Sequence, residues 1–330
     1  MAAAHPRVER ILIPTDFSPF SVRALRHAMA LTRKFKARLK VLHVVPYVFP
    51  AGDSLYSSAP WLMTPEIRLQ AEEEMRKFLA PVREARLDHE TEIREGDPWR
   101  EIAGVAEEMP ADLVVLGTHG RGGLERLFLG SVAEKLIRRL PCSVLTVCHE
   151  EGRTWEAPGL LTRILCATDF SETSSHALAF ALALADGNDA RVTLLNVIES
   201  IPDTREPSHF GVPDLQPLRE DLDRLARERL AKAIGDAGET GAKADPRVVF
   251  GRAYQEILRL AAEERADVIV IGAQGHGPIG HLLSGSNAQQ VVRQATCPVL
   301  TVRPRRTSER SKDPRSVGLV LTEPPPAGKN

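Results

Sequence analysis

The sequence repeats itself once over most of its length. "RILIPTDFS" at 10–18 returns as "RILCATDFS" at 163–171, and "CSVLTV" at 142–147 returns as "CPVLTV" at 297–302. The offset between the copies is 153 residues at the first motif and 155 at the last, so two residues were gained between the second and third expected strands. A repeat of this length is a whole domain and not one turn of a solenoid. We therefore predict two tandem domains at 8–148 and 161–303, joined by a linker at 149–160.

Each copy alternates short apolar runs with amphipathic helical patterns. In the first copy the runs lie at 11–13, 39–45, 113–116 and 143–147, with a weaker, polar candidate strand at 90–95. Apolar runs with few polar interruptions are typical of strands that are covered on both faces. The alternation predicts an α/β fold with an open parallel sheet flanked by helices. Ser18-Pro19, Ser171 and Asp97-Pro98 are expected helix starts.

The composition is that of an ordinary globular protein. The net charge is −1, with 43% hydrophobic and 26% charged residues, so nothing marks a nucleic-acid or membrane-surface binder. We expect neither a signal peptide nor a transmembrane helix, and a cytoplasmic location. Cys142, Cys166 and Cys297 lie in or beside apolar runs, which predicts buried, reduced thiols. The tail at 304–330 is expected to be disordered.

A glycine pattern follows the third of the four apolar runs in each copy. Gly117, Gly120 and Gly130 precede Ser131, and the spacing recurs at Gly272, Gly275, Gly285 and Ser286. The loop lies at a carboxyl end of the sheet, where open α/β folds bind ligands. Glycines at 117 and 120 can take positive φ. The first turn of the next helix has unpaired N–H groups that could bind a phosphate. Ser131 could either cap this helix or bond a phosphate oxygen. The alternative is that these glycines serve turns and helix packing. No GK[ST] follows, so the loop is not a Walker motif.

Polar side chains near this edge are further candidates. Asp16 and Asp169 either cap a helix or contact a ligand or cation; because Ser18 and Ser171 are better caps, ligand contact is favoured. His119, Arg121 and His276 are phosphate contacts or solvated side chains. His43 and Asn196 are interpreted as hydrogen-bonding partners inside the sheet. The aromatic segment 46–62 is a lid, a partner surface or a loop packed on its own domain.

The combination of "IPTDFS", "LHVV" and G-x2-G-x9-G-S resembles the universal stress protein family, over both copies. The resemblance implies an adenine nucleotide alpha hydrolase-like domain, with five parallel strands in the order 3-2-1-4-5. It also implies dimers in which fifth strands meet across a twofold axis. A tandem chain could form that pair within itself, and a homodimer stays open.

The resemblance further implies binding of ATP with Mg²⁺ or Mn²⁺. It assigns the adenosine end to Pro14, Thr15, Asp16 and Val44, and the ribose and phosphates to Gly117, Gly120, Gly130, Ser131 and Val132. The matching second-copy positions are Ala167, Thr168, Asp169, Val197, Gly272, Gly275, Gly285, Ser286 and Asn287. Ala167 replaces a proline and Asn287 an apolar residue, so the second site is expected to be slightly weaker.

The expected function is a stress response in which ATP is a regulatory or structural ligand. Two alternatives stay open: a slow ATPase on the same sites, and a scaffold whose nucleotide sites are vestigial. No Walker lysine is present and no obvious base lies beside the loop, so binding is favoured over catalysis and no catalytic residue is assigned.

Overall fold

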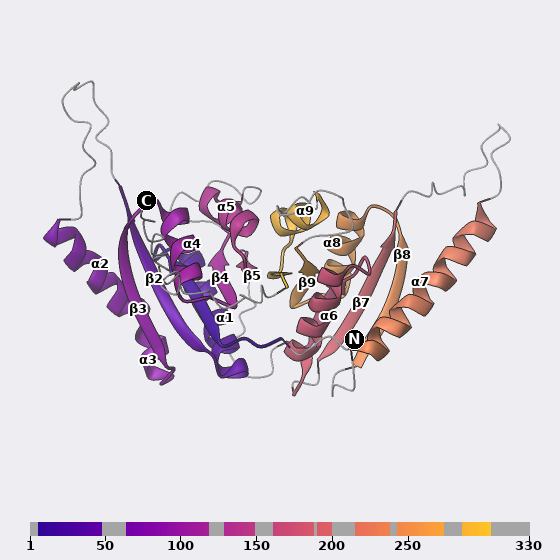
Figure 1. The fold of residues 1–330 in the computed structure, drawn as a ribbon, viewed down its shortest axis with the longest axis horizontal. Coiled ribbons are helices and arrows are strands. Elements are labelled where there is room, and N and C mark those ends of the chain that lie inside the picture. Colours follow the sequence, from indigo (N-terminus) through magenta and orange to yellow (C-terminus); the bar gives the residue numbers. More distant parts are fainter. Residues whose placement is uncertain are drawn as a thin grey trace, which may run out of the picture.

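The computed structural model describes residues 6–47, 64–118, 129–148, 161–187, 190–199, 215–237, 243–273 and 286–304. Its strands form one ten-stranded sheet in the order β3-β2-β1-β4-β5-β10-β9-β6-β7-β8. Figure 1 shows the two halves side by side, with helices around each half of the sheet and α2 and α7 at its outer ends. His119, Arg121, His276, the linker 149–160, residues 305–330 and all of 46–62 except its first two residues lie outside the described residues.

The first half contains five strands and five helices among its described residues. They are β1 (Arg10–Thr15), α1 (Pro19–Phe35), β2 (Arg38–Pro46), α2 (Pro65–Phe78), α3 (Ala80–Glu84), β3 (His89–Gly96), α4 (Pro98–Glu108), β4 (Leu113–Gly117), α5 (Ser131–Arg139) and β5 (Ser143–Val147). The second half contains β6 (Arg163–Ala167), α6 (Glu172–Ala185), β7 (Arg191–Ile198), α7 (Gln216–Asp236), β8 (Lys243–Phe250), α8 (Ala253–Glu263), β9 (Val268–Gly272), α9 (Ser286–Gln294) and β10 (Val299–Val302).

The strand order confirms the expected fold class. Neighbouring strands within each half are parallel, and the first half has the order 3-2-1-4-5. The second half has the same order read from the other end of the sheet. The polar candidate strand at 90–95 is β3, an edge strand whose side chains are mostly half-buried or exposed.

The crossover to the third strand contains the two extra residues. Val45 pairs with Glu95 in the first half, whereas its counterpart Ile198 pairs with Phe250 in the second. The first half makes this crossover with α2 and the short α3, whose first turn contains Pro81. A proline inside a helix removes an N–H donor and clashes with the preceding turn, so it favours a break. The second half crosses over on the single helix α7.

The two halves meet where the fifth strands pair. β5 and β10 are antiparallel, with Leu145 opposite Leu300, so the pairing that the resemblance implied between chains forms here within one chain. A hydrophobic cluster on one face of the sheet includes residues of both halves, and the rings of Phe35 and Phe180 contact each other across it with centroids 5.8 Å apart. Both fifth strands are thereby removed from the sheet edges, which protects them from pairing with other chains.

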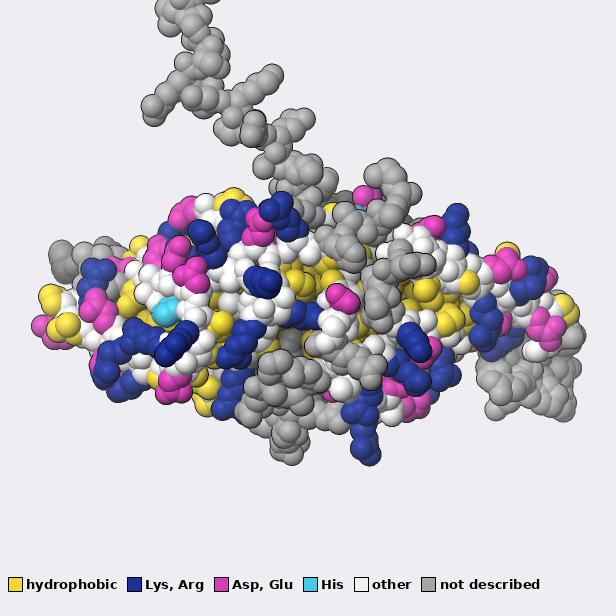
Figure 2. All heavy atoms as spheres, turned by 90° about the horizontal axis from the view of Figure 1, so that it is seen from below, with side chains coloured by type: hydrophobic (Ala, Val, Ile, Leu, Met, Phe, Trp, Pro, Cys, Tyr) yellow, Lys and Arg dark blue, Asp and Glu magenta, His cyan; other side chains and the backbone are white. Residues whose placement is uncertain are grey.

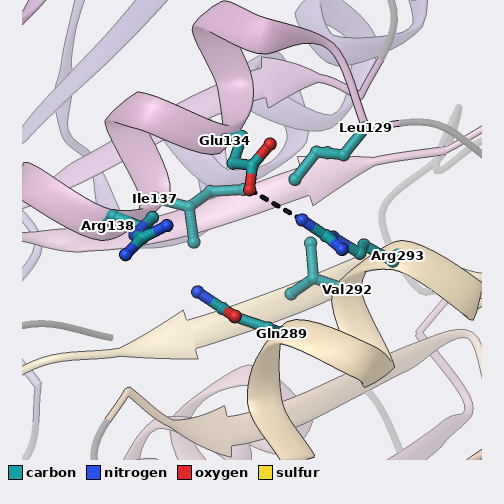
Figure 3. A pocket seen from close by; sticks show the side chains of 7 residues that line it. All are labelled: Leu129, Glu134, Ile137, Arg138, Gln289, Val292 and Arg293. Atoms are coloured by element: carbon teal, nitrogen blue, oxygen red, sulfur yellow. Dashed lines mark hydrogen bonds and ion pairs between the residues drawn. The ribbon is translucent and has the colours of Figure 1, made fainter. Parts of the chain in front are cut away.

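Polar contacts also cross this boundary. Figure 3 shows Glu134 of α5 pointing toward Arg293 of α9, and their Oε1 and Nη2 atoms are 2.7 Å apart. Arg303, which follows β10, donates from Nη2 to the carbonyl oxygens of Ile137 and Arg138 at 3.0 and 3.2 Å. These carbonyls belong to the last turn of α5, where backbone acceptors lack partners within the helix. The second half therefore caps a helix of the first.

The expected helix starts are confirmed. Ser18 precedes α1 and accepts a hydrogen bond from the Ser21 amide, and Ser171 does the same for Ser174 at α6. α4 begins at Pro98 as predicted, although the side chain of Asp97 makes no capping hydrogen bond. Local sequence therefore sets these boundaries, since the hydroxyl cap and the proline act within one turn.

The cysteines have the predicted environment. Cys142, Cys166 and Cys297 are buried free thiols, and Cys148 is half-buried. Burial raises the pKa of both Cys142 and Cys166 to about 12. These two thiols therefore stay protonated near neutral pH and are poor nucleophiles.

The edge of the molecule opposite the carboxyl ends of the strands has a mixed surface. In Figure 2, which looks onto this edge, basic and acidic side chains are interspersed over both halves. None of the helices in the described part of the chain is both long and apolar enough to cross a membrane.

Candidate functional site

A cavity of about 160 Å³ lies at the carboxyl end of the sheet in the second half. β6, β7, β9, α8 and α9 all contribute to its lining. β6 lies between β7 and β9, so the sheet order reverses here, and ligands of open α/β sheets bind at such a switch point.

The cavity brings together most of the residues predicted for the second half. Those that line it are Ala167, Thr168, Asp169, Val197, Gly272 and Asn287. Gly275 and Gly285 lie outside the described residues. Ser286 is described only as the first residue of α9. These residues therefore lie together around one cavity, and their role in ligand binding stays a prediction.

The lining is apolar except on a few side chains. Leu195, Ile257, Ile271 and Val291 contribute hydrocarbon, and the alanines leave room between them. Thr168, Asp169, Ser174 and Asn287 supply the polar side chains. A mainly apolar cavity with a few placed polar groups is typical of a site for a small organic ligand.

The same strained turn ends the first strand of each half. Phe17 and Phe170 have φ of 62° and 65°, in the left-handed region that phenylalanine rarely adopts. The hydroxyl of Thr15 accepts from the Phe17 amide at 2.9 Å, and that of Thr168 accepts from the Phe170 amide at 3.0 Å. Such a residue costs about 1–3 kcal/mol unless its surroundings hold it, and strain of this kind clusters at functional sites.

Aromatic and cationic contacts hold the two phenylalanines. The Phe17 ring lies 4.3 Å from the His43 ring and 5.7 Å from the Phe78 ring, measured between centroids. The guanidinium of Arg229 lies 4.0 Å from the centre of the Phe170 ring. The two turns therefore keep one backbone shape with different support.

Asp16 and Asp169 bond within the turns before α1 and α6, in addition to the serine caps. Oδ1 of Asp16 accepts from the Ser18 amide at 3.0 Å and from the Ser21 hydroxyl at 2.6 Å. Oδ1 of Asp169 accepts from both the amide and the hydroxyl of Ser171, at 3.0 and 2.6 Å. Both carboxylates thus order the turn, because an aspartate two residues before an amide readily closes such a ring. Ligand contact by these residues stays a prediction.

His43 and Asn196 have the role expected of them inside the sheet. His43 Nδ1 lies 2.7 Å from the carbonyl oxygen of Thr15, and Asn196 Nδ2 donates to that of Thr168 at 2.8 Å. A carbonyl oxygen only accepts, so His43 Nδ1 carries a hydrogen. Each side chain ties the second strand to the turn that borders the site.

The glycine loop of the first half closes at its base. The Gly130 amide donates to the carbonyl oxygen of Thr118 at 2.7 Å, while Gly120 lies outside the described residues. Gly130 is the N-cap of α5 and Ser131 its exposed first residue, so the suggestion that Ser131 caps the helix is wrong. A glycine cap has no side chain to bond the first amides of the helix, which are left for water or a ligand.

Gly117 and Gly272 serve helix packing instead of a left-handed turn. Neither has positive φ, so that part of the prediction is wrong. A Cβ on Gly117 would lie 2.9 Å from the Cβ of Phe20, and one on Gly272 would lie 3.0 Å from Thr173 Oγ1. The first turns of α1 and α6 thus approach the strand ends closely, as in the alternative reading of these glycines.

Alanine at position 117 is expected to lower the free energy of unfolding by about 1–3 kcal/mol, because backbone atoms of Phe20 cannot move aside easily. Gly235→Ala in α7 is the matched control, since its new Cβ meets nothing within 4 Å. That control is expected to raise stability by about 0.5–1 kcal/mol through helix propensity. Urea unfolding of both variants measures the difference, and equal effects would disprove close packing at Gly117.

The other predicted first-half residues lie where the pattern placed them. Pro14 and Thr15 end β1, Asp16 follows it, and Val44 is buried near the end of β2. Val132, in the first turn of α5, is half-buried and packs against the hydrophobic cluster between α5 and the sheet. These residues therefore share one edge of the sheet, together with Gly117 and Gly130.

The sequence reasoning missed the contribution of α8, whose counterpart in the first half is α4. Ala253 and Ile257 of α8 line the cavity. The available signal was the repeat "GDPWRE" at 96–101 and "GRAYQE" at 251–256. Gly96 and Gly251 have φ of 153° and 155°, and a Cβ on either would lie 2.8 Å from the Cγ of Glu101 or Glu256. This glycine–glutamate contact sets how each helix starts beside the site.

Within the described ranges there is no group of three or more His, Cys, Asp or Glu side chains that could hold a metal ion. The binding of a metal ion stays a prediction.

Known proteins place this chain in a family. The sequence model of the universal stress protein family matches residues 7–147 and 161–303. A universal stress protein of Methanocaldococcus jannaschii is 38% identical over 144 residues, 42% of this chain and 81% of that protein. One of Mycolicibacterium smegmatis is 27% identical over 300 residues, covering 89% of this chain and 97% of the relative.

The fold is also similar to solved structures. The crystal structure of a universal stress protein from Archaeoglobus fulgidus superposes with a TM-score of 0.63 at 22% identity, covering 89% of this chain and 98% of that one. At this identity the likeness concerns the fold alone. Together with the two matches of the family model, these findings show that the chain belongs to the universal stress protein family, a class of stress-response proteins, as a tandem member with two such domains.

Proposed function

We propose that the chain binds an adenine nucleotide, ATP with Mg²⁺ or Mn²⁺, at the carboxyl edge of each half. The nucleotide acts as a regulatory or structural ligand of a cytoplasmic stress-response protein. The observation that carries the proposal is the cavity at the β6–β9 switch point, whose lining includes Asp169 and Gly272 of the sequence patterns and four further residues that the resemblance assigned.

The lining suits the separate parts of a nucleotide. The base fits among Val197, Ile257 and Val291, because an apolar slot favours a flat heteroaromatic ring. Asp169 is an acceptor suited to a ribose hydroxyl. Asn287, the second residue of α9, also lines the cavity, so the amino end of that helix borders it. The unpaired amides and partial positive charge of a helix start favour phosphate there.

The first half has the same supporting parts. The Thr15-Asp16-Phe17 turn repeats the hydrogen bonds of its counterpart, and the bond from Gly130 to Thr118 closes the loop between β4 and α5. Because the local geometry is shared, the proposal extends to this half.

Calorimetric titration of the purified chain with Mg-ATP tests the proposal. We expect two sites, and Ala288→Leu is expected to remove one of them, because Ala288 lines the cavity of the second half and three added carbons would obstruct it. Ala231→Leu is the matched control, an exposed position on α7. Ligand at about 100 times its Kd should also raise the free energy of unfolding by about 2.7 kcal/mol.

The opposite results have clear meanings. An absence of binding heat and of thermal stabilisation would leave the scaffold function in place of nucleotide binding. Unchanged stoichiometry in Ala288→Leu would exclude this cavity as a site. Phosphate release by the wild type well above that of Ala288→Leu would instead assign slow ATP hydrolysis to the cavity.

A further inference from the structure

The carboxylate of Glu199 lies beside the cavity of the second half. Glu199 follows β7, is exposed, and accepts a hydrogen bond at Oε1 from the Ala253 amide at 2.7 Å. The same Oε1 accepts from Asn287 Nδ2 at 3.5 Å. Ala253 is the first residue of α8 and Asn287 the second of α9, and both line the cavity. The carboxylate thus bridges the amino ends of the two helices that border the cavity.

At this position the two helix starts would attract a bound anion most strongly. Each helix start carries the equivalent of about half a positive charge, and its first amides have no partner within the helix. Glu199 takes up one of these amides and places a negative charge among them. A phosphate that approached α9 would meet that charge, so part of the attraction that the helix offers is already cancelled.

Among the described residues of the first half, no carboxylate occupies the position that corresponds to Glu199. Val44 and Val197 occupy matching strand positions, so the counterpart of Glu199 is Pro46, at the end of β2. Asn287 corresponds to Val132. Asp97 directly precedes α4, and its Oδ2 lies 3.6 Å from Arg100 Nε, so an adjacent cation balances that charge. In the second half, the cation nearest in sequence to the start of α8 is Arg252.

We propose that Glu199 makes the second site discriminate against the polyphosphate chain, so that this site prefers a nucleoside while the first half prefers the triphosphate. The inference rests on the proposed nucleotide function and refines it for one site. The proposed preference comes from the negative charge of the Glu199 carboxylate. This charge can be removed while the hydrogen bond to the Ala253 amide is kept.

Glu199→Gln tests the inference, since the glutamine oxygen still accepts from the Ala253 amide. Adenosine and Mg-ATP are the probes, and the second site is the one that Ala288→Leu removes. We expect Glu199→Gln to strengthen ATP binding there about tenfold at low ionic strength, and to leave adenosine binding within about twofold. The gain should shrink at high salt, where the Debye length falls to about 3 Å. Glu228→Gln on α7 makes the same change of net charge away from the cavity. It should alter neither the affinity for ATP nor the affinity for adenosine.

Three results would overturn the inference alone, and a fourth would overturn the proposed function with it. If adenosine binds as expected but Glu199→Gln leaves the ratio of ATP to adenosine affinity unchanged, the carboxylate does not set specificity. If Glu199→Gln weakens the binding of ATP, then Glu199 favours ATP binding, for instance by contacting the cation that accompanies the nucleotide. If Mg-ATP binds a site that Ala288→Leu removes but adenosine does not, the inference is wrong while the proposed function stands. If neither probe binds such a site, the proposed function fails at this cavity and the inference falls with it.

Discussion

Replacing Leu300 by alanine is expected to lower the free energy of unfolding by about 2–5 kcal/mol, the usual cost of a large cavity in a core. Leu300 is 2% exposed and lies opposite Leu145, itself 1% exposed, where β10 meets β5. Leu145→Ala should cost a similar amount, although the two residues belong to different domains. Urea unfolding followed by circular dichroism gives the free energies.

The double variant shows whether the two halves share one core. Opposed side chains that contact each other should couple by about 0.5–3 kcal/mol in a double-mutant cycle. Leu218→Ala on α7 is the control, because Leu218 is 50% exposed and should cost little. If Leu300→Ala cost no more than this control, or if the cycle showed no coupling, the halves would be energetically separate.

Acid should destabilise the protein through His27. Burial within α1 lowers the pKa of His27 to about 3, with a smaller contribution from neighbouring Arg26. The unfolded chain has a histidine pKa near 6.5. Between these values the unfolded state binds a proton that the folded state excludes, so stability falls as pH drops from about 6.5 toward about 3. The slope is about 1.4 kcal/mol per pH unit, or about 2 kcal/mol lost by pH 5.

His27→Gln isolates this effect, because an amide has no titrating proton. The difference in unfolding free energy between wild type and variant should shift in favour of the variant by about 2 kcal/mol between pH 7 and pH 5. His176→Gln on α6 is the control, since that histidine is not buried. A difference that stays constant over this pH range would show that His27 does not control the acid response.

The sequence predicted the features that depend on neighbours along the chain. The helix starts at Ser18, Ser171 and Pro98 follow from caps that act within one turn. The repeat indicated two domains of one fold, and the apolar runs located the strands. The strand order came from the resemblance and not from the runs, because a pattern of burial does not state which strand lies beside which.

The candidate site was predicted in part, for a related reason. A strand end and the turn that follows it must lie at the carboxyl edge of a parallel sheet, so Thr168, Asp169 and Gly272 reach the cavity whatever the helices do. Ser174, Ile257 and Glu199 were missed, because their approach depends on how α6 and α8 pack. The sequence did not predict that Glu199 places its charge beside α9, because Glu199 belongs to a stretch of several polar residues.

Sequence alone thus determined that this chain is a duplicated α/β unit with a candidate ligand edge in each copy, since periodicity, caps and turns are encoded within short stretches. Only the tertiary structure decided that Gly117 makes room for α1, that Asp16 orders a turn, and that β5 and β10 join the halves into one sheet. Each of these depends on contact between segments far apart in the chain, and sequence spacing does not record such distances.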